Sequence, residues 1–371
     1  MAKIFSSNSW RSHAPDYVIV VCSFLLVIIG LAMLTSASSD RGQLRFGDSY
    51  FYLKHQLIYG LSLGIVLFIL ASNIYYRYLQ TFAIPLVMLN FLLLILVFTP
   101  LGISSGGATR WIQLGPISFQ PSELLKITFI VYLASWLSSR SNREQDFWGG
   151  FVPFLALIGI TGSLLIFQPS TSIAFILIMT ALAMYFSSGA KVSYILGTVL
   201  LGAAAFILIS YLTPYRWQRL MTYLDPDSNV KTSSYQVIQA KNAIGSGGIW
   251  GVGYGQSTTK LRSLPQPIDD SIFAVIAEEM GFVGSTFIIL LFSLVALRSF
   301  ILAKRVPDKF GQLLFIGFGS LITIQTFLHI GAISGLIPLT GVPLPFISYG
   351  GTALAIFMGI SGIMVNISKY T

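Results

Sequence analysis

Long apolar segments, separated by short polar or Gly/Pro-containing segments, recur along almost the whole chain. A helix needs about 20 apolar residues to cross a hydrocarbon core of about 30 Å. Segments of about this length predict an all-α polytopic membrane protein with about ten transmembrane helices. We place these helices at residues 17–37, 56–74, 79–99, 122–139, 150–167, 172–188, 192–213, 271–297, 309–333 and 348–368.

The composition supports the same class of protein, because 54% of the 371 residues are hydrophobic and only 9% are charged. Soluble globular proteins carry far more charge. We therefore expect one integral membrane domain over residues 1–371, with no large soluble domain. The first apolar segment is too long for the core of a signal peptide, so we expect it to be retained as a helix. The single cysteine, Cys22, excludes an intramolecular disulfide.

The net charge of +9 does not indicate nucleic-acid binding, because the basic residues are scattered over the loops between spans. Their distribution predicts the orientation, since cytoplasmic loops are enriched in Lys and Arg. With both termini in the cytoplasm, the short outer loops carry only Arg41, Arg45, Lys54 and Arg110. The inner side then carries Lys3, Arg11, Arg77, Arg140, Arg143, Lys191, Arg298, Lys304, Arg305, Lys309 and Lys369.

This orientation places one long connection, residues 214–270, on the outer side. Its first part carries Trp217, Leu220, Met221 and Leu224 at helical spacing, after Pro214 and before Pro226. The spacing predicts a short amphipathic helix, either on the outer membrane surface or packed as an ordinary loop helix.

A glycine-rich segment follows in the same loop, with six glycines between Gly245 and Gly255. Glycine backbone could present N–H groups to a phosphate. The Gly-Lys-Ser/Thr ending of a nucleotide-binding loop is missing, so the pattern predicts no nucleotide site. By itself it favours a flexible linker.

Charged residues within predicted membrane helices are candidates for function, because their burial in lipid is costly. Glu123 and Lys126 are three residues apart and can neutralise each other on one helix face. Their role is either this pairing or a contribution to a polar cavity. Glu278 and Glu279 lie about nine residues into the eighth predicted span, where each needs a Lys or Arg partner or a proton.

No metal centre can be assembled from His13, His55, His329 and Cys22. A Mg²⁺ or Mn²⁺ ion held by carboxylates stays compatible with the sequence. The outer side combines several cations with a few acids, which suits an anionic substrate carried on a lipid. Two of these acids, Asp269 and Asp270, precede the eighth span, and a carboxylate there could act as a general base.

Four motifs, in order along the chain, resemble those of one family. They are Gly107-Ala-Thr-Arg-Trp-Ile-Gln-Leu-Gly-Pro-Ile-Ser-Phe-Gln-Pro-Ser-Glu-Leu-Leu-Lys126, Tyr215-Arg-Trp-Gln-Arg with Leu224-Asp-Pro226, Ala243-Ile-Gly-Ser-Gly-Gly248, and Pro338-Leu-Thr-Gly-Val-Pro-Leu-Pro-Phe-Ile-Ser-Tyr-Gly-Gly351. Over essentially its whole length the chain resembles the SEDS family of FtsW, RodA and SpoVE.

The resemblance implies a ten-helix peptidoglycan glycosyltransferase in the bacterial cytoplasmic membrane. Such an enzyme polymerises lipid II at the outer face of that membrane and works with a class B penicillin-binding protein, a transpeptidase. The role in cell division or in elongation and cell shape stays open, with the residues around Lys260 and Asn366 looking slightly more like FtsW.

The resemblance also implies catalytic and binding residues. The family places its general base in a motif resembling Leu-Pro-Glu-x-x-Thr-Asp-Phe-Ile-Phe, which falls on Leu264-Pro-Gln-Pro-Ile-Asp-Asp-Ser-Ile-Phe273. Asp270 then is the base, and Asp269 stands in the threonine position. We expect the charge of Asp269 to raise the pKa of Asp270. The departures from the family pattern are Gln266, Ser271, Ser170 and His329.

The chemistry that the resemblance implies is an inverting glycosyl transfer, in which a sugar hydroxyl attacks the anomeric carbon and expels a polyprenyl pyrophosphate. Such a transfer needs one base and no covalent intermediate. The leaving polyprenyl pyrophosphate needs cations, for which Arg110, Arg216, Lys241 and Lys260 are candidates. Further candidate substrate-binding residues are Glu123, Lys126, Ser348 and Tyr349.

Two other functions fit the same sequence. A flippase for lipid-linked precursors would use Glu123, Lys126 and Glu278 as a translocation path. A non-catalytic scaffold for the transpeptidase would not need Asp270.

Overall fold

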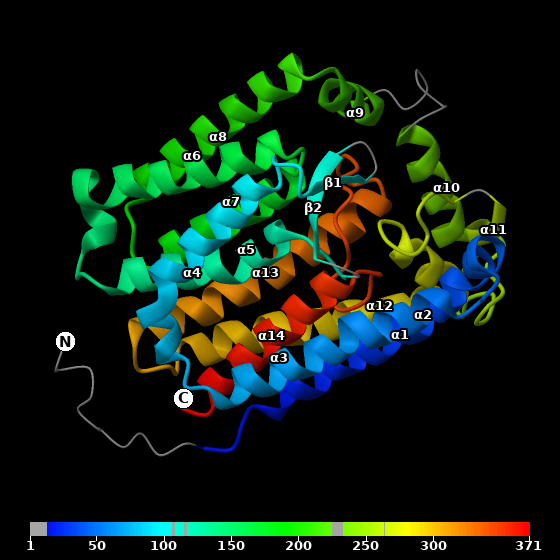
Figure 1. Ribbon diagram of the computed structural model, residues 1–371, viewed down its shortest axis with the longest axis horizontal. Helices are drawn as coiled ribbons and strands as arrows, with labels where there is room; N and C mark the ends of the chain where they lie inside the picture. The colour runs from blue at the N-terminus through cyan, green and yellow to red at the C-terminus, as the bar shows by residue number, and fades with distance from the viewer. Residues whose placement is uncertain (1–12, 106–107, 115–116, 225–232, 263) are drawn as a thin grey trace.

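The computed structural model describes residues 13–371 apart from 106–107, 115–116, 225–232 and 263. Long helices run side by side and form an elongated bundle (Figure 1). The start of α1 and the end of α14 lie at one end of this bundle, and a small sheet with the helices α9, α10 and α11 lies at the other. We call these the terminal end and the loop end.

The helices of the bundle correspond to the ten predicted spans. They are α1 (Tyr17–Phe46), α2 (Phe51–His55) continued by η1 (Gln56–Leu61) and α3 (Ser62–Asn73), α4 (Arg77–Leu96), α5 (Pro121–Ser138), η3 (Phe147–Phe151) continued by α6 (Val152–Phe167), α7 (Thr171–Ser187), α8 (Val192–Leu212), α12 (Ile272–Ala303), α13 (Lys309–Ile333) and α14 (Gly351–Ser368).

Within the described residues, eight of these helices are long and apolar enough to cross a membrane. The other two are α7, which has 17 residues, and α5, whose first two turns carry Glu123 and Lys126. Several helices are longer than predicted: α1 continues to Phe46 and α12 to Ala303. The predicted fold class is therefore confirmed.

The centre of the bundle is formed by α13 and α14. In their most apolar windows 78% and 83% of the residues are buried, against 6% for α8. Figure 1 shows α8 along the upper edge of the bundle beside α6. Small residues allow the close packing at the centre: a Cβ at Gly362 of α14 would lie 2.6 Å from the carbonyl oxygen of Phe68 in α3. The helices α13 and α14 therefore form the buried core of the bundle.

A small antiparallel sheet was missed by the sequence analysis. It connects α4 to α5 and consists of β1 (Gly102–Ser105), β2 (Ala108–Leu114) and β3 (Ile117–Phe119), in the order β1-β2-β3. The strands contain four, seven and three residues. Such short strands give little alternation of polar and apolar positions to recognise.

The long loop is largely helical in its described parts. It contains α9 (Pro214–Leu224), α10 (Ser233–Ser246) and α11 (Thr259–Arg262), while η2 (Arg143–Gln145) is a short turn at the terminal end. The predicted amphipathic helix is thus present as α9 and begins at Pro214. Pro226, Asp225, Asp227 and Lys231 lie outside the described residues.

The glycine-rich segment is packed against a break in α12, so the expected flexible linker was wrong. Gly281 in α12 has φ +66° and ψ −164°, which interrupts the helix. A Cβ on Gly281 would lie 2.3 Å from the backbone nitrogen of Gly251, and one on Gly251 would lie 2.1 Å from the carbonyl oxygen of Glu279. Glycine is therefore required on both sides of this contact.

Four backbone hydrogen bonds close the break. The N–H groups of Val252 and Gly253 donate to the carbonyls of Glu278 and Glu279, at 2.9 and 3.1 Å. The N–H groups of Phe282 and Val283 donate to the carbonyls of Gly248 and Ile249, at 2.9 and 3.1 Å. Non-helical backbone at membrane depth is stable only where its polar groups are satisfied within the protein. The glycine-rich segment satisfies them here.

Candidate active site

The predicted base, Asp270, lies in a tight turn just before α12. The N–H groups of Asp269 and Ser271 donate to the carbonyl oxygen of Gln266, at 3.3 and 3.1 Å. Gln266 has a positive φ of 47°. The buried Ser271 hydroxyl donates to the carbonyl of Pro265 at 2.9 Å. Ser271, one of the departures from the family pattern, therefore stabilises the turn that presents Asp270.

The segment after α13 supports this turn from the other side. The Ser348 hydroxyl donates to the carbonyl oxygen of Asp269 at 2.8 Å and accepts from the Leu344 N–H at 2.8 Å. The Tyr349 N–H donates to the carbonyl oxygen of Ile268 at 3.0 Å. Ser348 and Tyr349 thus hold the backbone just before Asp270.

Ser348 is buried, and its hydroxyl is engaged in these two hydrogen bonds. The one proton of the hydroxyl is used within the protein, and the predicted role of Ser348 in substrate binding stays a prediction. The phenol of Tyr349 lies 3.0 Å from Nδ1 of His55 in α2. Both residues act as supports of the Asp270 turn.

Gly341 approaches the Asp270 carboxylate closely. A Cβ at this position would lie 3.3 Å from Oδ2 of Asp270, and the φ of Gly341 is +63°. Glycine accommodates both the close approach and the left-handed backbone. One face of the carboxylate is therefore covered by the backbone of the segment between α13 and α14.

The two neighbouring acids have different electrostatic surroundings. Burial raises the pKa of the Asp270 carboxyl, and the positive charges of Arg219 and Arg110 oppose that rise. Burial, and then the charge of Asp270, raise the pKa of Asp269 to about 7, with Arg41 opposing. We expected the charge of Asp269 to raise the pKa of Asp270; the rise at Asp270 comes instead from burial, and the repulsion between the two acids raises the pKa of Asp269.

Arg110 reaches this site from strand β2. Its Nε donates to the carbonyl oxygen of Gln168 at 3.3 Å, and its Nη2 donates to the carbonyl oxygen of Pro169. The sheet thus places Arg110 against the turn that connects α6 to α7, from where its charge acts on the Asp270 carboxylate. The hydroxyl of Ser170 donates to the Gln168 carbonyl at 3.2 Å, where the family usually has an acid.

Arg219 in α9 is a second cation near Asp270, and the sequence analysis did not select it. Its Nη1 donates to the carbonyl oxygen of Leu339 at 3.2 Å. We selected Arg216, whose Nη2 instead donates to the carbonyl oxygen of Ile166 at the end of α6, at 3.2 Å. Burial lowers the pKa of Arg216. The spacing of the two arginines on one face of an amphipathic helix is a signal that could have identified both.

Lys241 lies on α10 with its side chain against the turn after α13. A Cβ on Gly335 would lie 2.6 Å from Nζ of Lys241. Lys241 is exposed at the loop end. Its predicted role in binding the substrate stays a prediction.

Lys260, by contrast, is buried in an ion pair. Its Nζ lies 2.6 Å from Oε1 of Glu279, 2.7 Å from the Ser36 hydroxyl and 3.0 Å from the carbonyl of Gly255. The three ammonium protons therefore all have acceptors within the protein. This geometry does not support the prediction that Lys260 neutralises the leaving pyrophosphate.

Glu278 is held by the segment that precedes Lys260. Its carboxylate accepts from the Ser257 hydroxyl at 2.5 Å, from the Thr259 hydroxyl at 2.9 Å and from the Thr258 N–H at 3.2 Å. The expectation of a Lys or Arg partner is met for Glu279 by Lys260. Glu278 instead has hydroxyl and amide donors.

Glu123 and Lys126 form the expected pair on α5. Nζ of Lys126 lies 2.8 and 2.9 Å from the two carboxylate oxygens of Glu123, and it also lies 5.1 Å from the centre of the Phe357 ring. The exposed fractions of the Lys126 and Glu123 side chains are 0% and 3%. The structure supports mutual neutralisation, while their contact with substrate stays a prediction.

The described residues contain no group of three His, Cys, Asp or Glu side chains that could hold a metal ion by themselves. Asp269 and Asp270 are two adjacent carboxylates, which is compatible with an ion that is also bound by substrate phosphates.

The site thus belongs to a polytopic membrane protein with a half-buried carboxylate near two arginines at one end of the bundle. A family model described as cell cycle protein, for FtsW, RodA and SpoVE, matches residues 16–371. The chain belongs to this family.

Individual relatives match over nearly their full length. Stage V sporulation protein E of Bacillus subtilis (strain 168) is 36% identical over 362 residues, which are 97% of this chain and 99% of that protein. A probable peptidoglycan glycosyltransferase FtsW of Coxiella burnetii is 37% identical over 99% of this chain and 98% of its own.

Solved structures match as well. A chain of a peptidoglycan synthase complex that coordinates polymerization and crosslinking aligns with a TM-score of 0.80 and 27% identity, over 96% of this chain and 98% of that chain. The rod shape determining protein RodA of Thermus thermophilus aligns with a TM-score of 0.69 and 26% identity, over 95% of this chain and 96% of its own.

Proposed function

We propose that the protein is a peptidoglycan glycosyltransferase that polymerises lipid II, with Asp270 as general base. The observation that carries this proposal is the Asp270 carboxylate, half-buried just before α12 and within reach of the charges of Arg110 and Arg219. Family membership and the names of the relatives support the reaction type.

The geometry suits an inverting transfer. A sugar hydroxyl is a poor nucleophile, and a carboxylate within hydrogen-bond reach can accept its proton as the bond to the anomeric carbon forms. Asp270 must be ionised for this role, and the two arginines favour its ionised form. The bond from the anomeric carbon to the polyprenyl pyrophosphate breaks in the same step.

The leaving pyrophosphate requires positive charge. Arg110 and Arg219, whose charges act on Asp270, would supply it beside the base, and the exposed Lys241 lies at the same end of the bundle. A Mg²⁺ or Mn²⁺ ion would be held by Asp269 or Asp270 together with the phosphates of the substrate, and would supply further charge neutralisation.

The proposed location is the cytoplasmic membrane of a bacterium, with both termini in the cytoplasm and the loop end outside. The distribution of cations supports this orientation, since Arg77, Arg140, Arg298, Lys304 and Arg305 belong to loops and helix ends on the terminal side. Reporter fusions after residue 371 and within the outer loop would test it. An external C-terminus would contradict it.

The proposed partner is a class B penicillin-binding protein. The likeness to a chain of a peptidoglycan synthase complex supports a partner of this type. Co-purification with candidate transpeptidases from the same cell tests this part separately from the reaction.

The decisive experiment uses the full chain in lipid, alone and together with the transpeptidase, supplied with lipid II and Mg²⁺ or Mn²⁺. We expect glycan polymer on a gel from the natural chain and none from Asp270→Asn. Asp40→Asn, which alters an exposed acid at the outer end of α1, is the matched control and should keep full activity. Polymer formation by Asp270→Asn would contradict the assigned base. Transport of lipid II without any polymerisation would instead support the flippase.

A further inference from the structure

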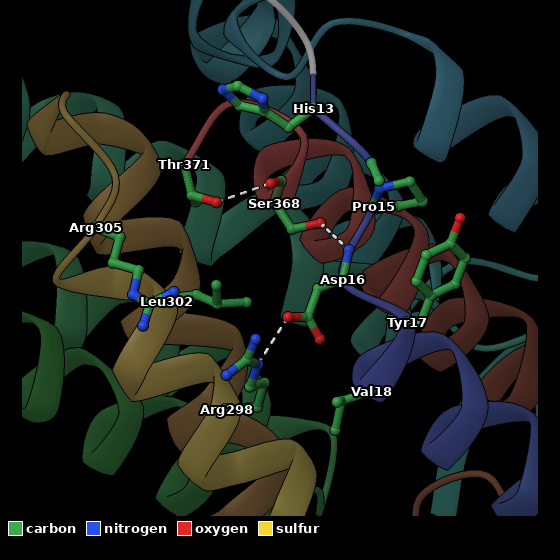
Figure 2. Close-up of a pocket in the computed structure, with 11 residues that line it drawn as sticks. His13, Pro15, Asp16, Tyr17, Val18, Arg298, Leu302, Arg305, Ser368 and Thr371 are labelled. Carbon is green, nitrogen blue, oxygen red and sulfur yellow. Dashed lines mark hydrogen bonds and ion pairs between the residues drawn. The ribbon is translucent and has the colours of Figure 1, made fainter.

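A pocket of about 350 Å³ lies at the terminal end, far along α12 from Asp270. Its walls are the residues before and in the first turn of α1, the end of α12, and the last residues of the chain. The lining residues include His13, Asp16, Val18, Arg298, Arg305 and Thr371. Figure 2 shows Arg298 directed at Asp16, with Leu302 and Arg305 on the same side of the pocket. None of these residues has a part in the proposed reaction.

The walls of the pocket are fixed by hydrogen bonds. The Asp16 N–H donates to the Ser368 hydroxyl at 2.9 Å, and the Thr371 hydroxyl donates to the Ser368 carbonyl at 2.8 Å (Figure 2). The His13 N–H donates to the carbonyl of Lys369 at 2.7 Å. The start of α1 and the end of α14 thus form one rigid side of the pocket.

Asp16 is the side-chain carboxylate in the pocket, and its two oxygens are already bound. Oδ1 accepts from the Ile19 N–H at 3.2 Å, and Oδ2 accepts from Nε of Arg298 at 2.7 Å. Arg305 has no hydrogen bond or ion pair from its side chain to any residue that the structure describes. Arg305 and the remaining N–H groups of Arg298 therefore offer donors for an anion.

Apolar side chains continue from the pocket toward the middle of the membrane. Leu294 and Ile301 of α12 are four residues before and three residues after Arg298, on the same helix face, and are 46% and 44% exposed. On α1, Val21 and Leu25 share the face of Val18 and are 52% and 36% exposed. An arginine pair at the end of such an apolar surface suits a molecule with a charged head and hydrocarbon tails.

We propose that this pocket binds the phosphate headgroup of an anionic phospholipid, whose acyl chains lie along the exposed faces of α1 and α12. Basic pockets at the ends of membrane helices bind such headgroups. A soluble phosphate compound would use the same arginines but would gain nothing from the apolar faces. The proposal goes beyond lipid II polymerisation and does not depend on it.

The test is native mass spectrometry of the purified full chain, titrated with phosphatidylglycerol or with phosphatidylcholine. Arg305→Gln removes the arginine that has no protein partner, and Lys304→Gln removes a neighbouring exposed charge that does not line the pocket. We expect Arg305→Gln to weaken phosphatidylglycerol binding about fivefold. Lys304→Gln should change it little, and phosphatidylcholine should bind weakly to all three proteins.

Equal losses of phosphatidylglycerol binding in Arg305→Gln and Lys304→Gln would show nonspecific attraction to the surface and overturn the proposal. Unchanged phosphatidylglycerol binding in Arg305→Gln would show that the pocket is not the binding site and would also overturn it. Competition by glycerol 3-phosphate at the same concentration as the lipid would also overturn it, in favour of a soluble phosphate ligand. An unchanged thermal unfolding midpoint in Arg305→Gln would show that the loss of binding is not a loss of folding.

Discussion

Nζ of Lys260 lies 2.6 Å from Oε1 of Glu279, and the exposed fractions of the two side chains are 3% and 0%. The pair joins the long loop to α12 two residues before the break at Gly281. Ser36 of α1 donates to the same carboxylate at 2.6 Å. One buried ionic contact therefore connects α1, the glycine-rich segment and the helix that begins just after Asp270.

Removal of one partner of this pair should destabilise the protein strongly. Glu279→Gln leaves the Lys260 ammonium buried without a counter-charge, and such losses cost about 3–5 kcal/mol. We expect a clear fall in the thermal unfolding midpoint of the purified protein. The double variant Lys260→Met/Glu279→Gln should recover part of the loss, because no unpaired charge is left. A double variant that is less stable than Glu279→Gln would contradict this account.

Gly281→Ala should distort the contact between α12 and the glycine-rich segment. The new Cβ would lie 2.3 Å from the Gly251 nitrogen, and φ of +66° is unfavourable for alanine. Backbone strain of this kind costs about 1–3 kcal/mol. Gly202→Ala is the matched control, since a Cβ at Gly202 of α8 meets no atom within 4 Å. We expect a lower unfolding midpoint only for Gly281→Ala, and equal midpoints would refute the packing role of Gly281.

Ser348→Ala should lower activity by loosening the Asp270 turn. The change removes the hydrogen bond to the Asp269 carbonyl and leaves the Leu344 N–H without its acceptor. Misplacement of a catalytic group by about 1 Å can reduce the rate about 100-fold. In a lipid II polymerisation assay we expect a lower kcat with little change in KM. A large change in KM alone would indicate direct substrate binding by Ser348 instead.

Asp269 should make folding stability depend on pH. Its pKa of about 7 in the folded protein is above the ordinary value of 3.8, so the folded state binds the extra proton between these values. The stabilising contribution is complete below the unfolded pKa and is lost as pH rises through about 7. Asp269→Asn should therefore be more stable than the natural chain at pH 8, by about 1 kcal/mol or more, and the gain should shrink at pH 5. A gain that does not vary with pH would contradict the shifted pKa.

The pH dependence of catalysis gives a separate test of the charges around Asp270. A general base acts only when ionised, so activity should rise with pH through the raised pKa of Asp270. The charge of Arg219 opposes that rise, so Arg219→Gln should raise the pKa of Asp270 further. The acidic limb of the pH–activity profile should then move to higher pH. Lys304→Gln, which loses the same charge at an exposed position, should leave the limb unmoved.

The sequence by itself determined the membrane class and the approximate positions of the ten spans. Each helix in a bilayer must satisfy its own backbone hydrogen bonds and present apolar side chains over about 20 residues. The sequence pattern that predicts a membrane span is therefore contained within the span itself. The pairing of Glu123 with Lys126 was predictable for the same reason, since residues three apart on a helix are neighbours. The motif around Asp270 indicated the candidate base without any structure.

Only the tertiary structure decided which groups surround that base. The contacts of Ser348 with Asp269, of Lys260 with Glu279 and of Gly251 with Gly281 join residues far apart in the sequence or in different elements. Cations that the sequence does not distinguish have different partners in the fold. Lys260 forms a buried ion pair, Arg216 binds the end of α6, and Arg219 lies near Asp270. Charge type is a local property of the sequence, whereas the partner of a charge is set by which helices meet in three dimensions.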